Sequence, residues 1–194
     1  MFLRVLAATG RGMQNQTRRI IQTGLFVALV VVLGFLLAEV PNVELMTVTV
    51  FLSGVILGPV NGIIVGTISI IIYSLFNPYG PPLPPLVLAQ ILGFALVGWS
   101  GGILRRRILP RDKAAYLFSA LAGLMLTLIY DSLTTAATAF IVLGREGFAR
   151  GLAGCFIAGS LFIVIHTFSN TIVFTLATVP VLRAVSAWEG GRRA

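Results

Sequence analysis

The stretch LMTVTVFLSGVILGPVNGIIVGTISIIIYSLFNPYGPPLPPLVLAQILGFALVGWSGGIL (residues 45–104) decides the fold, because none of its 60 residues carries a formal charge. A helix that crosses a bilayer needs about 20 mostly apolar residues, so this stretch has room for roughly three crossings. The whole chain has the same character. It is 57% hydrophobic and only 10% charged, whereas soluble domains are about 25% charged. The sequence therefore predicts an integral membrane protein.

Breaker residues divide the chain into six apolar spans. Proline and glycine clusters end helices or form turns, and the predicted spans between such breaks are 20–38, 45–57, 63–76, 86–104, 114–144 and 151–182. The second and third are short, so we expect them to extend into their flanking turns. The fifth and sixth would each be about 46 Å long as helices and must tilt or contain a break. We predict an all-α transmembrane bundle of six helices over residues 20–184, with tails at 1–19 and 185–194.

The basic residues indicate the topology. Thirteen of the fourteen are arginines, and they lie between the apolar spans. With the amino terminus inside, twelve basic residues fall on inner segments, and only Arg145 and Arg150 fall on outer loops. The positive-inside rule then predicts that both termini are cytoplasmic and that the loops at 39–44, 77–85 and 145–150 face outward. The net charge of +8 is therefore assigned to topology rather than to nucleic-acid binding.

Several classes of protein do not fit the sequence. The single cysteine, Cys155, excludes a disulfide framework and argues against a cysteine-based metal cluster. No hydrophilic segment approaches the size of a nucleotide-binding domain, and no HExxH motif is present. We therefore predict no enzyme, no catalytic residues, no metal site and no cofactor.

Two ionisable residues lie deep in predicted spans. Such a group costs about 2.5–3.5 kcal/mol at the bilayer centre, so it usually faces a partner or a cavity. Asp131 lies about 16 residues before the centre of the last outer loop and His166 about 18 after it, so their depths differ by only about 3 Å. We expect them to be neighbours. Three interpretations stay open: a structural pair, contact with a ligand, and a proton relay.

Other polar residues lie on the outer half. Asn170 follows His166 by one helical turn and shares its face, and further polar residues lie near the outer ends of several spans. Together they predict a pocket that opens outward. The candidate binding residues are Asn42, Glu44, Asn77, Tyr79, Gln90, Asp131, Thr135, His166 and Asn170.

A pair of small residues lies at the inner end of the first span. Gly24 and Ala28 are four residues apart, a spacing that lets another helix approach closely. We expect this pair to contact a partner helix, which can lie within the chain or outside it.

Five short motifs resemble a known family. In chain order they are PNVEL (41–45), FLSGVILGP (51–59), YSLFNP (73–78), YDSLT (130–134) and HTFSN (166–170). In their order and spacing, over residues 18–184, they are similar to the substrate-binding S-components of energy-coupling factor (ECF) vitamin transporters.

The resemblance implies the substrate-capture subunit of an ATP-driven importer in the bacterial cytoplasmic membrane. It implies a vitamin-like ligand bound near the outer surface, a transmembrane coupling subunit and two cytoplasmic ATPases as partners. Gly24 and Ala28 match the place where the family contacts its coupling subunit. The identity of the vitamin does not carry over, although the acidic Glu44 and Asp131 disfavour an anionic ligand.

Two other functions compete with this interpretation. One is a small proton-coupled secondary transporter that uses Asp131 and His166 as a relay, and the other is an intramembrane hydrolase. Secondary transporters often show two related halves, and no convincing repeat relates residues 20–104 to residues 114–182.

Overall fold

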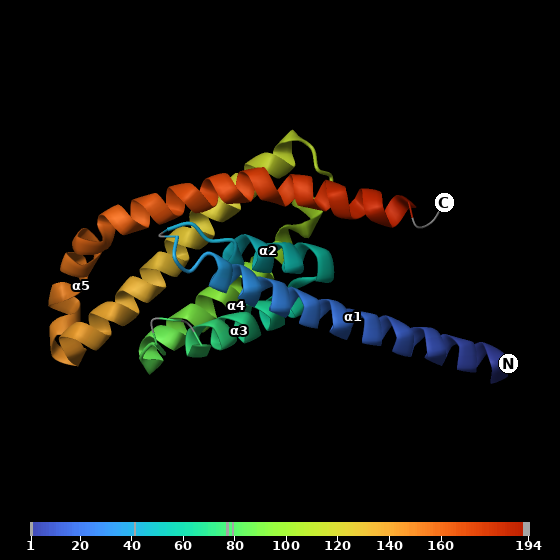
Figure 1. Ribbon diagram of the computed structural model, residues 1–194, viewed down its shortest axis with the longest axis horizontal. Coiled ribbons are helices and arrows are strands. Elements are labelled where there is room, and N and C mark those ends of the chain that lie inside the picture. The colour runs from blue at the N-terminus through green and yellow to red at the C-terminus, as the bar shows by residue number, and fades with distance from the viewer. Residues whose placement is uncertain (1, 41, 77, 79, 192–194) are drawn as a thin grey trace.

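The computed structural model describes residues 2–40, 42–76, 78 and 80–191, and all regular secondary structure in them is helical. The helices are α1 (Phe2–Leu36), α2 (Met46–Leu57), α3 (Pro59–Phe76), α4 (Pro84–Ile108) and α5 (Lys113–Gly191). Four of them are long and apolar enough to cross a membrane, and α2 is a shorter apolar helix. The prediction of an all-α membrane protein is confirmed. The start of α1 and the end of α5 lie at the same end of the molecule (Figure 1).

Within the described residues the structure has five helices rather than the predicted six. The prediction of a loop at 145–150 is wrong, because those residues are helical and only Gly144, with φ 63° and ψ −177°, departs from helical geometry. Glycine adopts positive φ without steric cost, so one residue reverses the chain. Gly144 thereby divides α5 into a first arm and a second arm, which fold back beside each other (Figure 1).

The predicted turn at 58–62 is also shorter than expected. Only Gly58 (φ 97°) separates α2 from α3, because Pro59 is compatible with the first position of a helix, where its fixed φ fits and its missing N–H is not needed. α3 therefore extends into its flanking turn as predicted. α2 does not: its 12 residues span about 18 Å.

The outer helices are longer than predicted. α1 continues through residues 2–19 and α5 continues to Gly191, so most of both segments predicted as tails is helical. α4 begins at Pro84 and runs past Arg105–Arg107 to Ile108, because long arginine side chains near a helix end can reach the interface while the backbone stays helical.

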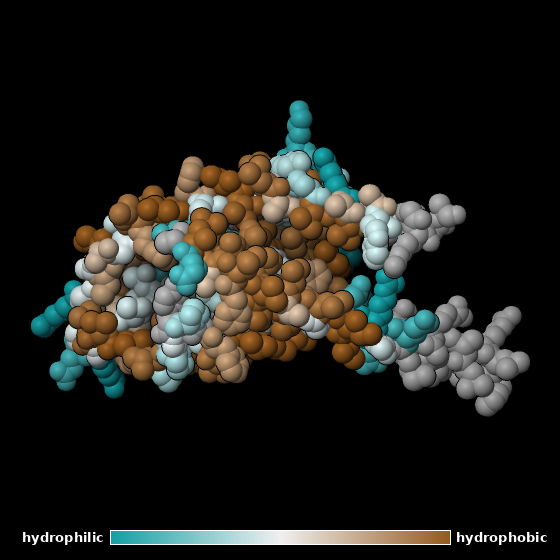
Figure 2. All heavy atoms as spheres, in the orientation of Figure 1, coloured by the Kyte–Doolittle hydropathy of each residue, from teal (hydrophilic) through white to brown (hydrophobic). Residues whose placement is uncertain are grey.

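α2 lies at the centre of the fold. Eleven of its twelve residues are buried, and it contacts each of the other four helices. α1 packs on α2 and α3, whereas α5 packs on α2 and α4. The outer helices expose apolar side chains such as Leu25, Leu161 and Phe168, and Figure 2 shows a broad apolar face with hydrophilic residues gathered towards the two ends. Such a surface fits lipid tails.

Glycines let α2, α3 and α4 touch through their backbones. A Cβ on Gly54 or Gly62 would collide with the carbonyl oxygen of Gly98, and a Cβ on Gly98 would collide with the carbonyl oxygen of Gly62. These atoms belong to backbone and cannot rotate away. Close approach through small residues is a main source of packing between membrane helices.

We predict that Gly98→Ala destabilises the bundle by about 1–3 kcal/mol, because overpacking forces backbones apart. Thermal unfolding in detergent measures the change. Gly24→Ala is the matched control, since a Cβ there meets no atom within 4 Å. Equal stability of the two variants would contradict the proposed backbone contact.

Candidate functional site

A cavity of about 370 Å³ lies beside the end of α1 and the start of α2. Its volume is within the range of small-molecule sites. α1 and α5 do not pack against each other in the described part of the chain, and the cavity lies between them. It is lined by Gly34, Leu37, Ala38, Val40, Asn42, Val43, Glu44, Met46, Tyr73, Phe162 and His166.

Asp131 and His166 are neighbours, as expected from their depths. His166 Nδ1 lies 2.8 Å from Asp131 Oδ1, and the two residues come from the two arms of α5. A carboxylate only accepts hydrogen bonds, so we assign the proton to Nδ1, which donates to Asp131. Asp131 is 2% exposed and does not line the cavity, whereas His166 does. Asp131 therefore orients the imidazole from behind.

Asn170 connects this pair to the rest of the site. Its Nδ2 lies 3.1 Å from Glu44 Oε1, 3.2 Å from Thr127 Oγ1 and 3.2 Å from His166 Nε2. The amide nitrogen carries two hydrogens, so it can donate to two of these three atoms at a time. Asn170 is 1% exposed, so its hydrogen bonds are shielded from water and hold three segments of the chain together.

Glu44 lies two residues before the start of α2 and lines the cavity. Its Oε2 accepts from the backbone N–H of Thr47 at 3.1 Å, and the Thr47 hydroxyl donates to Oε1. Oε1 also lies 3.9 Å from His166 Nε2. Burial raises the pKa of the Glu44 carboxyl, but His166, Thr47 and Asn170 outweigh burial and hold that pKa below its ordinary value. Glu44 is therefore a carboxylate at neutral pH.

Three acceptor atoms of this cluster have no hydrogen-bond partner among the described residues. They are Asn42 Oδ1, Asp131 Oδ2 and Asn170 Oδ1, and all three are buried. An unsatisfied buried acceptor costs about 1–3 kcal/mol. Of these three residues Asn42 lines the cavity, so its amide favours a ligand that brings an N–H or O–H donor.

The structure does not gather all of the predicted site residues. Gln90 Oε1 accepts from the Ser74 hydroxyl at 2.9 Å and so connects α4 to α3, and neither Gln90 nor the half-buried Thr135 lines the cavity. Asn77 and Tyr79 lie outside the described residues. Asn42, Glu44, Asp131, His166 and Asn170 are brought together.

Sequence reasoning missed four residues of the site. Tyr73 and Phe162 line the cavity, and Thr47 and Thr127 bond to the polar cluster. Phe162 precedes His166 by one helical turn, and the two ring centroids are 5.5 Å apart. The i, i+4 spacing from His166 is the sequence signal that could have identified Phe162.

Gly24 and Ala28 do not line this cavity and are exposed. Nothing lies within 4 Å of a Cβ built on Gly24. Gly24 borders a groove of about 560 Å³ between α1 and α3, whose walls include Ile20, Val27 and Ile64. The small residues are therefore not covered by another helix in the described part of the chain.

Fold and site together define a multi-pass helical membrane protein with a buried polar cluster beneath a small cavity. A family model described as "ECF transporter, substrate-specific component" matches residues 18–182. The chain belongs to this family, whose members are transporter subunits, as the five sequence motifs indicated. No curated protein and no solved structure gives a significant match to the chain.

We predict that Asp131→Ala lowers the stability of the ligand-free protein by about 1–3 kcal/mol, because a buried N–H of His166 loses its acceptor. Ser132→Ala is the control: Ser132 is exposed and its hydroxyl donates to the carbonyl of Leu128 in the same helix. Its effect should stay within about 0.5 kcal/mol. Denaturation in detergent compares the two, and an unchanged midpoint for Asp131→Ala would refute the positioning role.

Proposed function

We propose that the chain captures a vitamin or related micronutrient in the cavity beside Glu44 and His166. A transmembrane coupling subunit then accepts the ligand, and two cytoplasmic ATPases drive its import. The observation that carries this proposal is a ligand-sized cavity placed over a buried, hydrogen-bonded cluster, in a member of the substrate-specific family.

The proposed topology has six crossings in the bacterial cytoplasmic membrane, with both termini cytoplasmic. Two observations support it: Gly144 divides α5 into two antiparallel arms, and the start of α1 and the end of α5 lie at one end of the molecule (Figure 1). That end carries the arginine-rich segments, so the positive-inside rule gives the same orientation. The cavity then opens near the outer surface.

The proposed ligand is neutral or cationic and carries several hydrogen-bond donors. Glu44 and Asn42 both line the cavity. The Glu44 carboxylate repels an anion, and the unsatisfied oxygen of Asn42 favours a donor over a pure acceptor. Phe162 and Tyr73 supply aromatic surface on the other walls. In this proposal Asn42, Glu44 and His166 contact the ligand, while Asp131 and Asn170 hold those groups in place.

We predict that Glu44→Gln weakens ligand binding by roughly 10- to 100-fold, because a charge-assisted hydrogen bond is worth about 1.5–3 kcal/mol. Mass spectrometry of small molecules retained through purification first names the ligand, and titration calorimetry then measures affinity. Glu39→Gln removes the same charge from an exposed position in the same connection and should bind normally. Equal ligand affinities of the Glu44→Gln and Glu39→Gln variants would show that Glu44 does not contact the ligand.

A proton-coupled secondary transporter is the second candidate, and the 2.8 Å contact between His166 and Asp131 favours it. Two groups this close can pass a proton. Uptake into liposomes by the chain alone, driven by a proton gradient, would support this function. Uptake that needs the ATPase module would support capture and delivery.

Gly24 and Ala28 are proposed to contact the coupling subunit through the groove between α1 and α3. We predict that Gly24→Leu with Ala28→Leu abolishes co-purification with the coupling subunit and ATP-driven uptake, because leucine prevents close helix approach. Ligand binding by the isolated chain should survive, since neither residue lines the polar cavity.

The chain supplies a matched control for this test. Gly154 and Ala158 have the same spacing on α5, both are exposed, and a Cβ on Gly154 meets no atom within 4 Å. Gly154→Leu with Ala158→Leu should leave assembly intact. If both double variants lose assembly equally, the effect is not specific to the α1 groove.

A further inference from the structure

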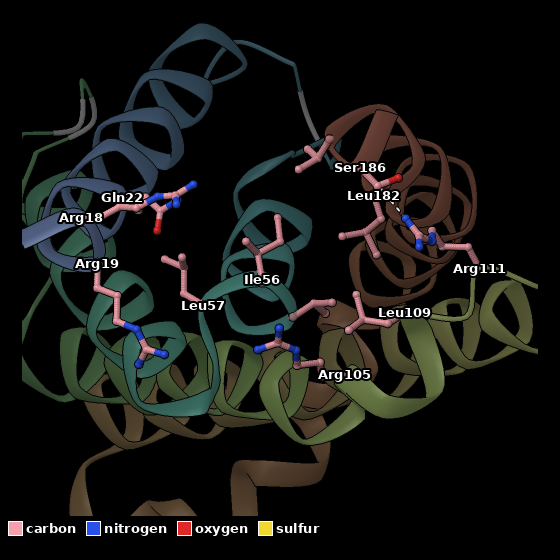
Figure 3. A pocket seen from close by; sticks show the side chains of 12 residues that line it. Arg18, Arg19, Gln22, Ile56, Leu57, Arg105, Leu109, Arg111, Leu182 and Ser186 are labelled. Atoms are coloured by element: carbon pink, nitrogen blue, oxygen red, sulfur yellow. Dashed lines mark hydrogen bonds between the residues drawn. The ribbon is translucent and has the colours of Figure 1, made fainter. Parts of the chain in front are cut away.

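A second cavity, of about 440 Å³, lies at the opposite end of the bundle. Arg18 and Arg19 of α1, Arg105 near the end of α4, and Arg111 of the following connection contribute its cationic side chains. Figure 3 shows these arginines coming from separate elements around the gap between α1, α2 and the end of α5. Neither the fold nor the proposed capture function uses this cavity.

The cations around this cavity have no acidic partner among the residues that the structure describes. No carboxylate lines it, and the ion pairs among the described residues both involve His166 at the other end. Arg111 Nη1 is 3.4 Å from the carbonyl oxygen of Leu182, which it can approach only as a donor (Figure 3). Like charges gathered around one hollow repel each other, so the cavity favours an anion.

Apart from Gln22 and Ser186, the remaining wall of the cavity is apolar. Ile56 and Leu57 at the end of α2, Leu109, and Leu182 of α5 line it beside the arginines. Free phosphate would gain nothing from these side chains. A phospholipid combines a phosphate with acyl chains, and basic pockets between membrane helices on the cytoplasmic side bind anionic headgroups.

We propose that this cavity binds an anionic phospholipid. Arg18, Arg19 and Arg105 pair with the headgroup phosphate, which the planar guanidinium recognises through two parallel N–H donors, and the apolar wall contacts the first part of the acyl chains. The site lies where the uncharged stretch of α4 ends at Arg105, the depth at which headgroups meet hydrocarbon.

If the arginines served only to set the topology, their effect on lipid binding would not depend on whether they line the cavity. Arg106 and Arg107 provide the comparison, because they lie in the same helical turn as Arg105 but do not line the cavity. Arg107 instead lies over the ring of Phe118, 5.7 Å from its centroid. Arg106 with Arg107 carries the same charge as Arg18 with Arg105. Comparing the two pairs therefore distinguishes binding in the cavity from a general attraction of anionic lipid to positive charge.

The test uses the full chain, purified in a neutral detergent and titrated with phosphatidylglycerol, phosphatidylcholine or inorganic phosphate. Native mass spectrometry counts retained lipid, and thermal unfolding reports stabilisation. Phosphatidylglycerol should bind and raise the melting temperature, and phosphatidylcholine should not. Each arginine near an anionic headgroup contributes about fivefold in affinity, so Arg18→Gln with Arg105→Gln should weaken binding roughly 25-fold. Arg106→Gln with Arg107→Gln should bind as the unaltered chain does.

Four results would overturn the proposal. Equal binding of the two lipids would show that charge plays no part, and equal losses in the two double variants would show that only total charge matters. The same stabilisation by inorganic phosphate would assign the cavity to the free anion. Loss of assembly with the coupling module in Arg18→Gln/Arg105→Gln alone, without lipid binding by the unaltered chain, would assign it to an acidic protein surface. None of these results bears on ligand capture at the other end.

Discussion

The backbone contact among α2, α3 and α4 is the constraint on which the rest of the structure depends. Gly54, Gly62 and Gly98 bring three helices so close that carbonyl oxygens occupy the places where side chains would lie. Because α2 is held this way, eleven of its twelve residues are buried although the helix spans only about 18 Å. Its first turn then places Thr47 beneath Glu44, and its last turn forms the wall of the arginine-lined cavity.

The polar cluster depends on that placement. Burying charges in a low-dielectric interior is costly unless each finds a partner with good geometry. Here the partners come from three segments: Glu44 from the connection before α2, Thr127 and Asp131 from the first arm of α5, and His166 and Asn170 from the second arm. The cluster can form only when the reversal at Gly144 sets the two arms side by side and α2 is already in position.

Much of the fold could be predicted from the sequence, because sixty residues without a charge leave few alternatives to membrane helices. The pairing of Asp131 and His166 was predictable because both lie deep in the two spans on either side of one reversal, although that reversal falls at Gly144 rather than at the predicted centre of the loop. The helix boundaries were harder: Pro59 starts a helix as readily as it ends one, and residues 145–150 are polar yet helical. Gln90 shows the limit for the site. The polarity and depth of Gln90 match those of a binding residue. Its hydrogen bond with Ser74, however, depends on how α3 and α4 face each other, which the sequence does not reveal.

The residues that line the outer cavity and the glycines that pack the helices lie in different segments, and this affects which substitutions the chain can accept. Nine of the eleven residues around the outer cavity come from α1, the connection after it, or α5; only Met46 and Tyr73 belong to the glycine-packed helices. Exchanges at the nine positions alter the shape and polarity presented to a ligand without disturbing the three glycines. Ligand specificity can therefore change from one small molecule to another while the packing of α2, α3 and α4 stays the same. A side chain added at one of the three glycines, in contrast, affects every helix that contacts it.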